Sequence, residues 1–283
     1  MQISSNMSKF FKSSIFKTLV YANVFISICS LSQVFVTYAI FPIPINFKNN
    51  SYLLFILLST YLQYNIQRGY LVNQNNQFSD RSIWLTKYKK ILLISVGLCL
   101  ISVLFLCNNL SYLSIGIMVG AEVLSTLYYL PPINLRKYGY IKPFLISLIW
   151  VISCSAVPLI ENNLLNANSM WFLISQFCFI GTLCALFDIK DAEEDYLNGV
   201  NTYANKFGET ITKTLCIVLM LISSGCYFFF KHSSTSLLPI SIIISSLTIG
   251  SALLTSEKKQ PYFYYLWIDG LLIIQGLLLM IFL

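Results

Sequence analysis

Long apolar segments constrain this chain more than any other feature of its sequence. A helix of about 20 apolar residues spans the hydrocarbon core of a bilayer, and segments of this kind follow one another along the whole chain. Their predicted bounds are 18–41, 51–68, 90–107, 111–130, 143–160, 170–187, 211–230, 236–254 and 263–283. We therefore predict an all-α, polytopic transmembrane bundle of about nine helices, forming a single integral membrane domain over residues 1–283.

Charged residues are too few for a chain that faces water on all sides. They make up 10% of the sequence, whereas a soluble domain carries roughly a quarter, and the mean hydropathy is +0.72. The first apolar segment is longer than the roughly 7–15 residues of a secretory signal core, and no small-residue cleavage site follows it. We expect it to be the first anchor of an integral, multi-pass membrane protein.

Lysine and arginine are distributed unevenly between the loops on the two sides of the predicted membrane. Lys48 and Lys231 fall on one side, and the other 16 of the 18 basic residues fall on the opposite side. Loops rich in Lys and Arg stay in the cytoplasm, so we predict a cytoplasmic N-terminus and an external C-terminus. The net charge of +7 reflects this topology. It favours membrane lipid as a partner and gives no reason to expect nucleic acid.

The densest group of acids follows the sixth apolar segment and reads Asp-Ile-Lys-Asp-Ala-Glu-Glu-Asp over residues 188–195. If the sixth helix continues through it, Asp188, Asp191 and Asp195 lie within an arc of about 60° on one face. Carboxylates this close repel one another unless a cation neutralises them. Mg²⁺ binds through carboxylates and substrate phosphates, so we predict these three aspartates as its ligands. A solvated acidic loop is the alternative interpretation.

Other polar residues on the same side of the membrane could complete a site. Arg136, Lys137 and Lys142 follow the fourth segment and could bind phosphate oxygens, or could serve only as topology anchors. Asn65 and Arg68 lie one helical turn apart at the cytoplasmic end of the second segment. They are either ordinary interface residues or a second wall of the site.

Two stretches resemble the UbiA family of intramembrane prenyltransferases. The segment 188–208, with its three spaced aspartates and the later Lys-Phe-Gly, is similar to the family's second aspartate motif and its downstream loop. The stretch 128–137, Tyr-Tyr-Leu-Pro-Pro-Ile-Asn-Leu-Arg-Lys, resembles the proline-containing segment between the family's fourth and fifth spans. The nine-segment layout also fits, so the resemblance covers nearly the whole chain.

The resemblance implies a bundle of nine helices around a central cavity that is open to lipid. It also implies that Mg²⁺ ions hold a prenyl diphosphate between two aspartate motifs, and that diphosphate departs while the prenyl group alkylates an acceptor. An apolar bundle would keep water away from the allylic cation. The residues assigned on this basis are Asn65, Arg68 and Asp191 for catalysis and Arg136, Lys137, Lys142 and Tyr128 for substrate binding.

The first aspartate motif departs from the family pattern. That motif places aspartates four and eight residues after an asparagine, whereas here Asn65 is followed at those positions by Gly69 and Asn73. Arg68 could replace the missing carboxylate–Mg²⁺–phosphate bridge with a direct contact, because a guanidinium matches phosphate geometry. We therefore predict fewer bound Mg²⁺ ions than in standard family members.

Two functions stay open. One is a prenyltransferase with an altered or reduced active site, which transfers a prenyl group from a prenyl diphosphate to a lipophilic acceptor. The other is a catalytically inactive membrane protein of the same fold, which binds an isoprenoid or acts as a scaffold. A transporter fits less well, because the acids cluster at the membrane surface and the segments lack the paired Gly/Pro breaks of transporter helices.

Overall fold

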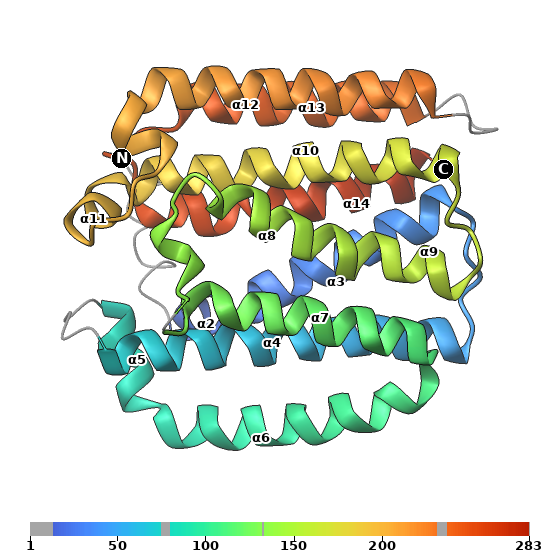
Figure 1. The fold of residues 1–283 in the computed structure, drawn as a ribbon, viewed down its shortest axis with the longest axis horizontal. Coiled ribbons are helices and arrows are strands. Elements are labelled where there is room, and N and C mark those ends of the chain that lie inside the picture. The colour runs from blue at the N-terminus through green and yellow to red at the C-terminus, as the bar shows by residue number, and fades with distance from the viewer. Residues whose placement is uncertain (1–13, 75–79, 132, 231–236, 283) are drawn as a thin grey trace. The chain divides into compact units, whose positions relative to one another are not determined.

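The computed structural model describes residues 14–74, 80–131, 133–230 and 237–282, with the backbone alone at Ser14 and at 71–74. All regular structure in these ranges is helical, which confirms the predicted all-α class (Figure 1). Lys231 and the side chain of Asn73 lie outside the described residues. The α-helices are α2 (Ser14–Tyr21), α3 (Val24–Ile40), α4 (Phe47–Gln74), α5 (Asp80–Lys87), α6 (Lys89–Leu106), α7 (Tyr112–Tyr129), α8 (Lys142–Val151), α9 (Val157–Glu161), α10 (Ala167–Lys190), α11 (Ala192–Leu197), α12 (Tyr203–Phe229), α13 (Leu237–Leu254) and α14 (Gly270–Phe282).

The helices reproduce the order of the predicted spans. Within the described residues, seven stretches are long and apolar enough to cross a membrane, and the bent pair of α2 and α3 makes an eighth if it counts as one span. The helix α4, which is 28 residues long, occupies the place of the second predicted segment but does not belong to those seven. The seven stretches, the bent pair and α4 match the nine predicted segments one to one. The chain is an integral, multi-pass membrane protein.

The chain divides into two compact units. The first unit comprises residues 1–31 and 45–110, and the second comprises 32–44 and 111–283. The helix α3 therefore begins in the first unit and ends in the second. The single membrane domain and the central cavity expected from the sequence stay predictions.

In the first unit, α4 packs along α6, and α5 contacts both α2 and α6. A bend of 61° separates α2 from α3. At this bend Asn23 has a φ of +61°, a left-handed conformation in which asparagine is enriched among non-glycine residues. The bend therefore falls at a residue type that tolerates the required backbone conformation.

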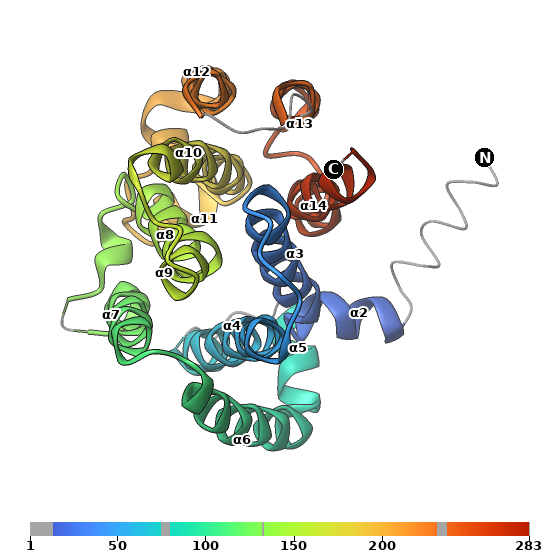
Figure 2. The same ribbon diagram turned by 90° about the vertical axis from the view of Figure 1, so that its right-hand side faces the viewer.

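The second unit is organised around α10. This helix packs between α8 and α12, and α13 lies beside both α12 and α14 (Figures 1 and 2). Hydroxyl groups join the helices: Ser175 Oγ lies 2.9 Å from Ser223 Oγ, and Ser224 Oγ lies 2.6 Å from Ser245 Oγ. Because lipid is as apolar as the helix surfaces, such hydrogen bonds and close packing hold membrane helices together.

Three loops of the second unit lie at one end of its helices, at the left of Figure 1. They follow α7, α10 and α13 and cover residues 133–141, 191–202 and 255–262. The sequence placed all three on the lysine- and arginine-rich side of the membrane. This end of the second unit carries the candidate site.

Candidate functional site

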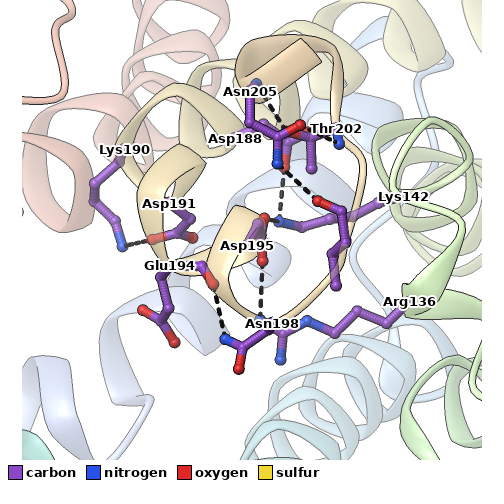
Figure 3. Close-up of polar contacts among 11 residues, drawn as sticks. Arg136, Lys142, Asp188, Lys190, Asp191, Glu194, Asp195, Asn198, Thr202 and Asn205 are labelled. Atoms are coloured by element: carbon purple, nitrogen blue, oxygen red, sulfur yellow. Dashed lines mark hydrogen bonds and ion pairs between the residues drawn. The ribbon is translucent and has the colours of Figure 1, made fainter.

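The acidic segment is not one continuous helix. The helix α10 ends at Lys190, Asp191 has a φ of −94° and a ψ of 6°, and α11 begins at Ala192. The expected arc of three carboxylates on one helical face required an unbroken helix, and the structure corrects that expectation. The break turns Asp191 away from Asp188 and Asp195, which meet each other at a shared basic residue (Figure 3).

That basic residue is Lys142, the first residue of α8. Its Nζ lies 2.7 Å from Asp188 Oδ1 and 2.8 Å from Asp195 Oδ2. The contact with Asp195 is a hydrogen bond as well as an ion pair. The contact with Asp188 is an ion pair at a distance that also suits a hydrogen bond. Both carboxylates are buried, with 1% and 0% of their side chains exposed.

Arg136 adds a second cation to this group. Its Nη2 lies 3.3 Å from Asp195 Oδ1, and a quarter of its side chain is exposed. Burial alone would lower the pKa of the Arg136 guanidinium, but the nearby Tyr128 and Asp195 outweigh this effect and raise the pKa above its usual value. A guanidinium has five N–H donors, and the contact with Asp195 uses one nitrogen. The group stays charged and keeps donors for a ligand.

Asp191 has its own partner on the neighbouring residue. Lys190 Nζ lies 2.6 Å from Asp191 Oδ1 and 3.3 Å from the hydroxyl oxygen of Tyr265. The ammonium also lies 4.9 Å from the centre of the Tyr265 ring. Each of the three aspartates predicted as metal ligands is therefore paired with an ammonium group of the chain itself.

The loops before α8 and after α11 pack closely against each other. Gly139 leaves room for the Asn201 backbone, because a Cβ at this glycine would overlap the Asn201 carbonyl. The ring of Tyr140 lies edge-on to that of Tyr203, with centroids 5.1 Å apart. The loop after α11 is fixed at its start, where the Val200 N–H donates to the Asp195 carbonyl oxygen over 2.8 Å. This packing holds Lys142 against the two carboxylates.

The remaining residues predicted in the second unit lie near this cluster or beside it. Tyr128 is buried at the end of α7 and interacts electrostatically with Lys142 and Arg136. Lys137 is exposed and follows Arg136 directly. The residues predicted from the sequence are therefore neighbours in the structure, and their substrate-binding roles stay predictions.

Asn65, predicted as a catalytic residue, is a buried hydrogen-bonding residue of the first unit. Its Nδ2 donates to the Ala22 carbonyl oxygen over 3.0 Å and to the Tyr61 carbonyl oxygen over 2.8 Å. Its Oδ1 accepts from Asn23 Nδ2 over 3.1 Å. The side chain of Asn65 therefore ties α4 to the bend between α2 and α3.

Arg81 completes this arrangement, and the sequence did not identify it. Its Nη2 donates to Asn23 Oδ1 over 2.6 Å and lies 3.4 Å from the carbonyl oxygens of Val20 and Tyr21, at the end of α2. The last carbonyls of a helix have no partner within the helix, which a basic side chain can supply. No local pattern around Arg81 marks it for this role.

Arg68 is half-buried on α4, and its side chain makes no hydrogen bond or ion pair among the described residues. It belongs with Asn65 to the first unit, whereas the acidic cluster belongs to the second. The second wall that the sequence suggested for Asn65 and Arg68 stays a prediction.

A magnesium ion held by Asp188, Asp191 and Asp195 together does not fit these residues. Within the described part of the chain, no three acidic, histidine or cysteine side chains are grouped so that they could hold a metal ion. Asp188 and Asp195 offer the oxygen ligands that Mg²⁺ prefers, but the ammonium of Lys142 lies between them, and Asp191 contacts Lys190.

Comparison with known proteins gives one family. The sequence model of the UbiA prenyltransferase family matches residues 85–267. No curated protein matches the chain. Two similar solved structures are a UbiA homologue from Archaeoglobus fulgidus (17% identity, TM-score 0.62, covering 93% of this chain and 98% of that one) and a UbiA homologue from the same organism bound to DMAPP and Mg²⁺ (15%, 0.63, 94% and 99%).

A third similar structure is described for digeranylgeranylglyceryl phosphate synthase in membranes. It shares 16% identity with this chain at a TM-score of 0.59, and the match covers 95% of this chain and 98% of that one. At these identities the likeness shows a common fold.

Proposed function

The chain belongs to the UbiA prenyltransferase family, and from this premise we propose that it transfers a prenyl group from a prenyl diphosphate to a lipophilic acceptor at an altered site. The observation that carries the proposal is Arg136, a charged and partly exposed guanidinium at the end of helices that are otherwise apolar. Lys137 lies next to it and is exposed. This combination suits a ligand with an anionic head and a hydrocarbon tail.

The reaction would proceed by loss of diphosphate. The bond between the first prenyl carbon and the bridging oxygen breaks, and the electron pair stays with the diphosphate. N–H donors of Arg136 aimed at these oxygens would stabilise the charge that develops on the leaving group. A nucleophilic atom of the acceptor then bonds to the prenyl carbon and loses a proton, while the apolar helices keep water from the cation.

The altered part of the site concerns the metal. A similar solved structure contains DMAPP and Mg²⁺. We propose that this chain binds fewer Mg²⁺ ions than standard family members, because its own ammonium groups already pair with Asp188, Asp191 and Asp195. The cytoplasmic N-terminus inferred from the basic loops belongs to the same proposal. It places the candidate site on the cytoplasmic side.

The same pairing supports a second candidate function. If the three aspartates are permanently neutralised, the protein could bind an isoprenoid without turnover, as an inactive binding or scaffold protein. Turnover separates the two functions. The protein in membrane vesicles is mixed with radiolabelled prenyl diphosphates of several tail lengths and a panel of lipophilic acceptors, and labelled product and released diphosphate are measured.

Transfer that is lost in Arg136→Gln and retained in the exposed control Lys258→Gln would support the transferase. Saturable retention of label with neither product nor released diphosphate would reject the transferase and support the binding protein. Neither turnover nor retention would reject both candidates.

A further inference from the structure

We propose that Lys142 is a resident counter-cation of the acidic segment and that it excludes a divalent metal ion from the space between Asp188 and Asp195. The inference rests on contacts within the second unit alone. It deepens the proposed function by stating how this half of the site is neutralised before substrate arrives. Its test measures metal binding without turnover, so its failure is distinguishable from failure of the proposed function.

The position of the ammonium is the first argument. Lys142 Nζ contacts one oxygen of each carboxylate at 2.7 and 2.8 Å. A magnesium ion that bridged the same two oxygens would need both of them at about 2.0–2.1 Å. That ion would occupy the space between the carboxylates in which the ammonium lies. The ammonium of Lys142 and a metal ion therefore cannot occupy this position at the same time.

Charge balance is the second argument. Asp188 and Asp195 contribute two negative charges, and Lys142 and Arg136 contribute two positive charges. Buried charges must be paired because their desolvation is costly, and this group is already neutral. A divalent ion added to it would create an excess of two positive charges beside two buried carboxylates.

Asp188 gives the third argument. Its side chain is 1% exposed, and the ammonium that contacts it at 2.7 Å is that of Lys142. The ion pair with Lys142 is therefore its direct neutralising contact within the described part of the chain. If the ammonium is removed, a buried carboxyl group remains whose ionised form needs another cation beside it.

The backbone holds the lysine in place. Lys142 begins α8 and is followed by Pro143, whose fixed backbone angle suits the first turn of a helix. The preceding loop is tied to the loop after α11 by the close approach of Gly139 to Asn201. The ammonium therefore belongs to the folded site and is not a mobile surface group; one tenth of its side chain is exposed.

The experiment uses the full chain in detergent, Mn²⁺ as a spectroscopic probe and Mg²⁺ as its competitor. Wild type is expected to show no Mn²⁺ site that depends on Asp195, so Asp195→Asn leaves its binding unchanged. Lys142→Gln, which keeps hydrogen-bond donors but removes the charge, should gain one site with affinity higher by on the order of 100-fold or more, because the repulsion between ammonium and metal is lost. Adding Asp195→Asn to Lys142→Gln should abolish the new site.

If Lys142→Gln is too unstable for direct binding measurements, thermal unfolding with and without Mn²⁺ detects the same site. A metal that binds the folded state alone stabilises it, so Mn²⁺ should raise the unfolding midpoint of Lys142→Gln by several degrees and leave wild type and Lys142→Arg unchanged. The matched control is Lys258→Gln, which alters an exposed lysine in the loop after α13 and should behave as wild type. The proposal is overturned if wild type binds Mn²⁺ through Asp195, or if Lys142→Gln gains neither binding nor stabilisation.

Discussion

The buried hydrogen bonds of Asn65 lead to a stability prediction. Asn65→Ala removes three hydrogen bonds, to the carbonyl oxygens of Ala22 and Tyr61 and from Asn23 Nδ2. Each buried hydrogen bond contributes about 0.5–1.5 kcal/mol, so the free energy of unfolding should fall by roughly 2–4 kcal/mol. In a chain of this size that loss lowers the unfolding midpoint by roughly 5–10 °C.

Asn65→Asp is the sharper variant. It preserves the volume and the oxygen that accepts from Asn23, but it replaces the Nδ2 donor by an oxygen that faces the carbonyl oxygens of Ala22 and Tyr61. We expect a loss of stability at least as large as that of Asn65→Ala. A substrate-binding role alone would leave this conservative variant as stable as wild type.

The assay is thermal unfolding of the detergent-solubilised protein, followed by circular dichroism in the absence of ligand. Arg68→Ala is the matched control, because it lies one turn further along α4 and its side chain makes no hydrogen bond or ion pair with another described residue. It should unfold within about 1–2 °C of wild type, as surface substitutions usually do. Equal midpoints for wild type and both Asn65 variants would refute the structural assignment.

Three further predictions concern the second unit, and thermal unfolding checks each of them. Gly139→Ala should destabilise by roughly 1–3 kcal/mol, because its Cβ would overlap the loop after α11, whereas Gly225→Ala, which has open space, should be neutral or slightly stabilising; equal effects would contradict the close packing. Gly208→Ala should cost about 1–3 kcal/mol, because its φ of +86° and ψ of 168° suit glycine alone; an unchanged midpoint would contradict this conformation. A double-mutant cycle of Ser175→Ala and Ser223→Ala should give a coupling of about 0.6 kcal/mol across the two helices; strict additivity would argue against the hydrogen bond.

The helices were predictable from the sequence because their length and apolar character are local properties. The predicted segment 170–187 corresponds to α10, and 90–107 corresponds to α6 and the short turn after it. A bilayer imposes a single thickness on every span. The spans can therefore be located in the sequence without knowing which helices pack against each other. The break at Asp191 lies beyond the apolar stretch, where this constraint no longer applies.

The role of Asn65 could not be predicted, because its partners are remote in the sequence. Asn23 lies 42 residues away, and no periodicity joins the two positions. Resemblance to a family placed Asn65 in a catalytic motif. The structure shows its Nδ2 donating to the carbonyl oxygens of Ala22, at the bend, and Tyr61, on α4, and its Oδ1 accepting from Asn23; its catalytic role stays a prediction.

For the acidic segment, the need for a neutralising cation could be predicted from the sequence, but the identity of that cation could not. Two adjacent carboxylates require a cation, and this requirement could be deduced from spacing alone. Which cation satisfies it depends on Lys142, which lies 53 residues from Asp195 and reaches it only because α8 packs on α10. Like charges about 4 Å apart repel by about 4 kcal/mol at an effective dielectric of 20, and a divalent ion doubles this to roughly 8 kcal/mol. A metal could therefore bind between Asp188 and Asp195 only if Lys142 moved away, and that movement would have to break both of its contacts at 2.7 and 2.8 Å.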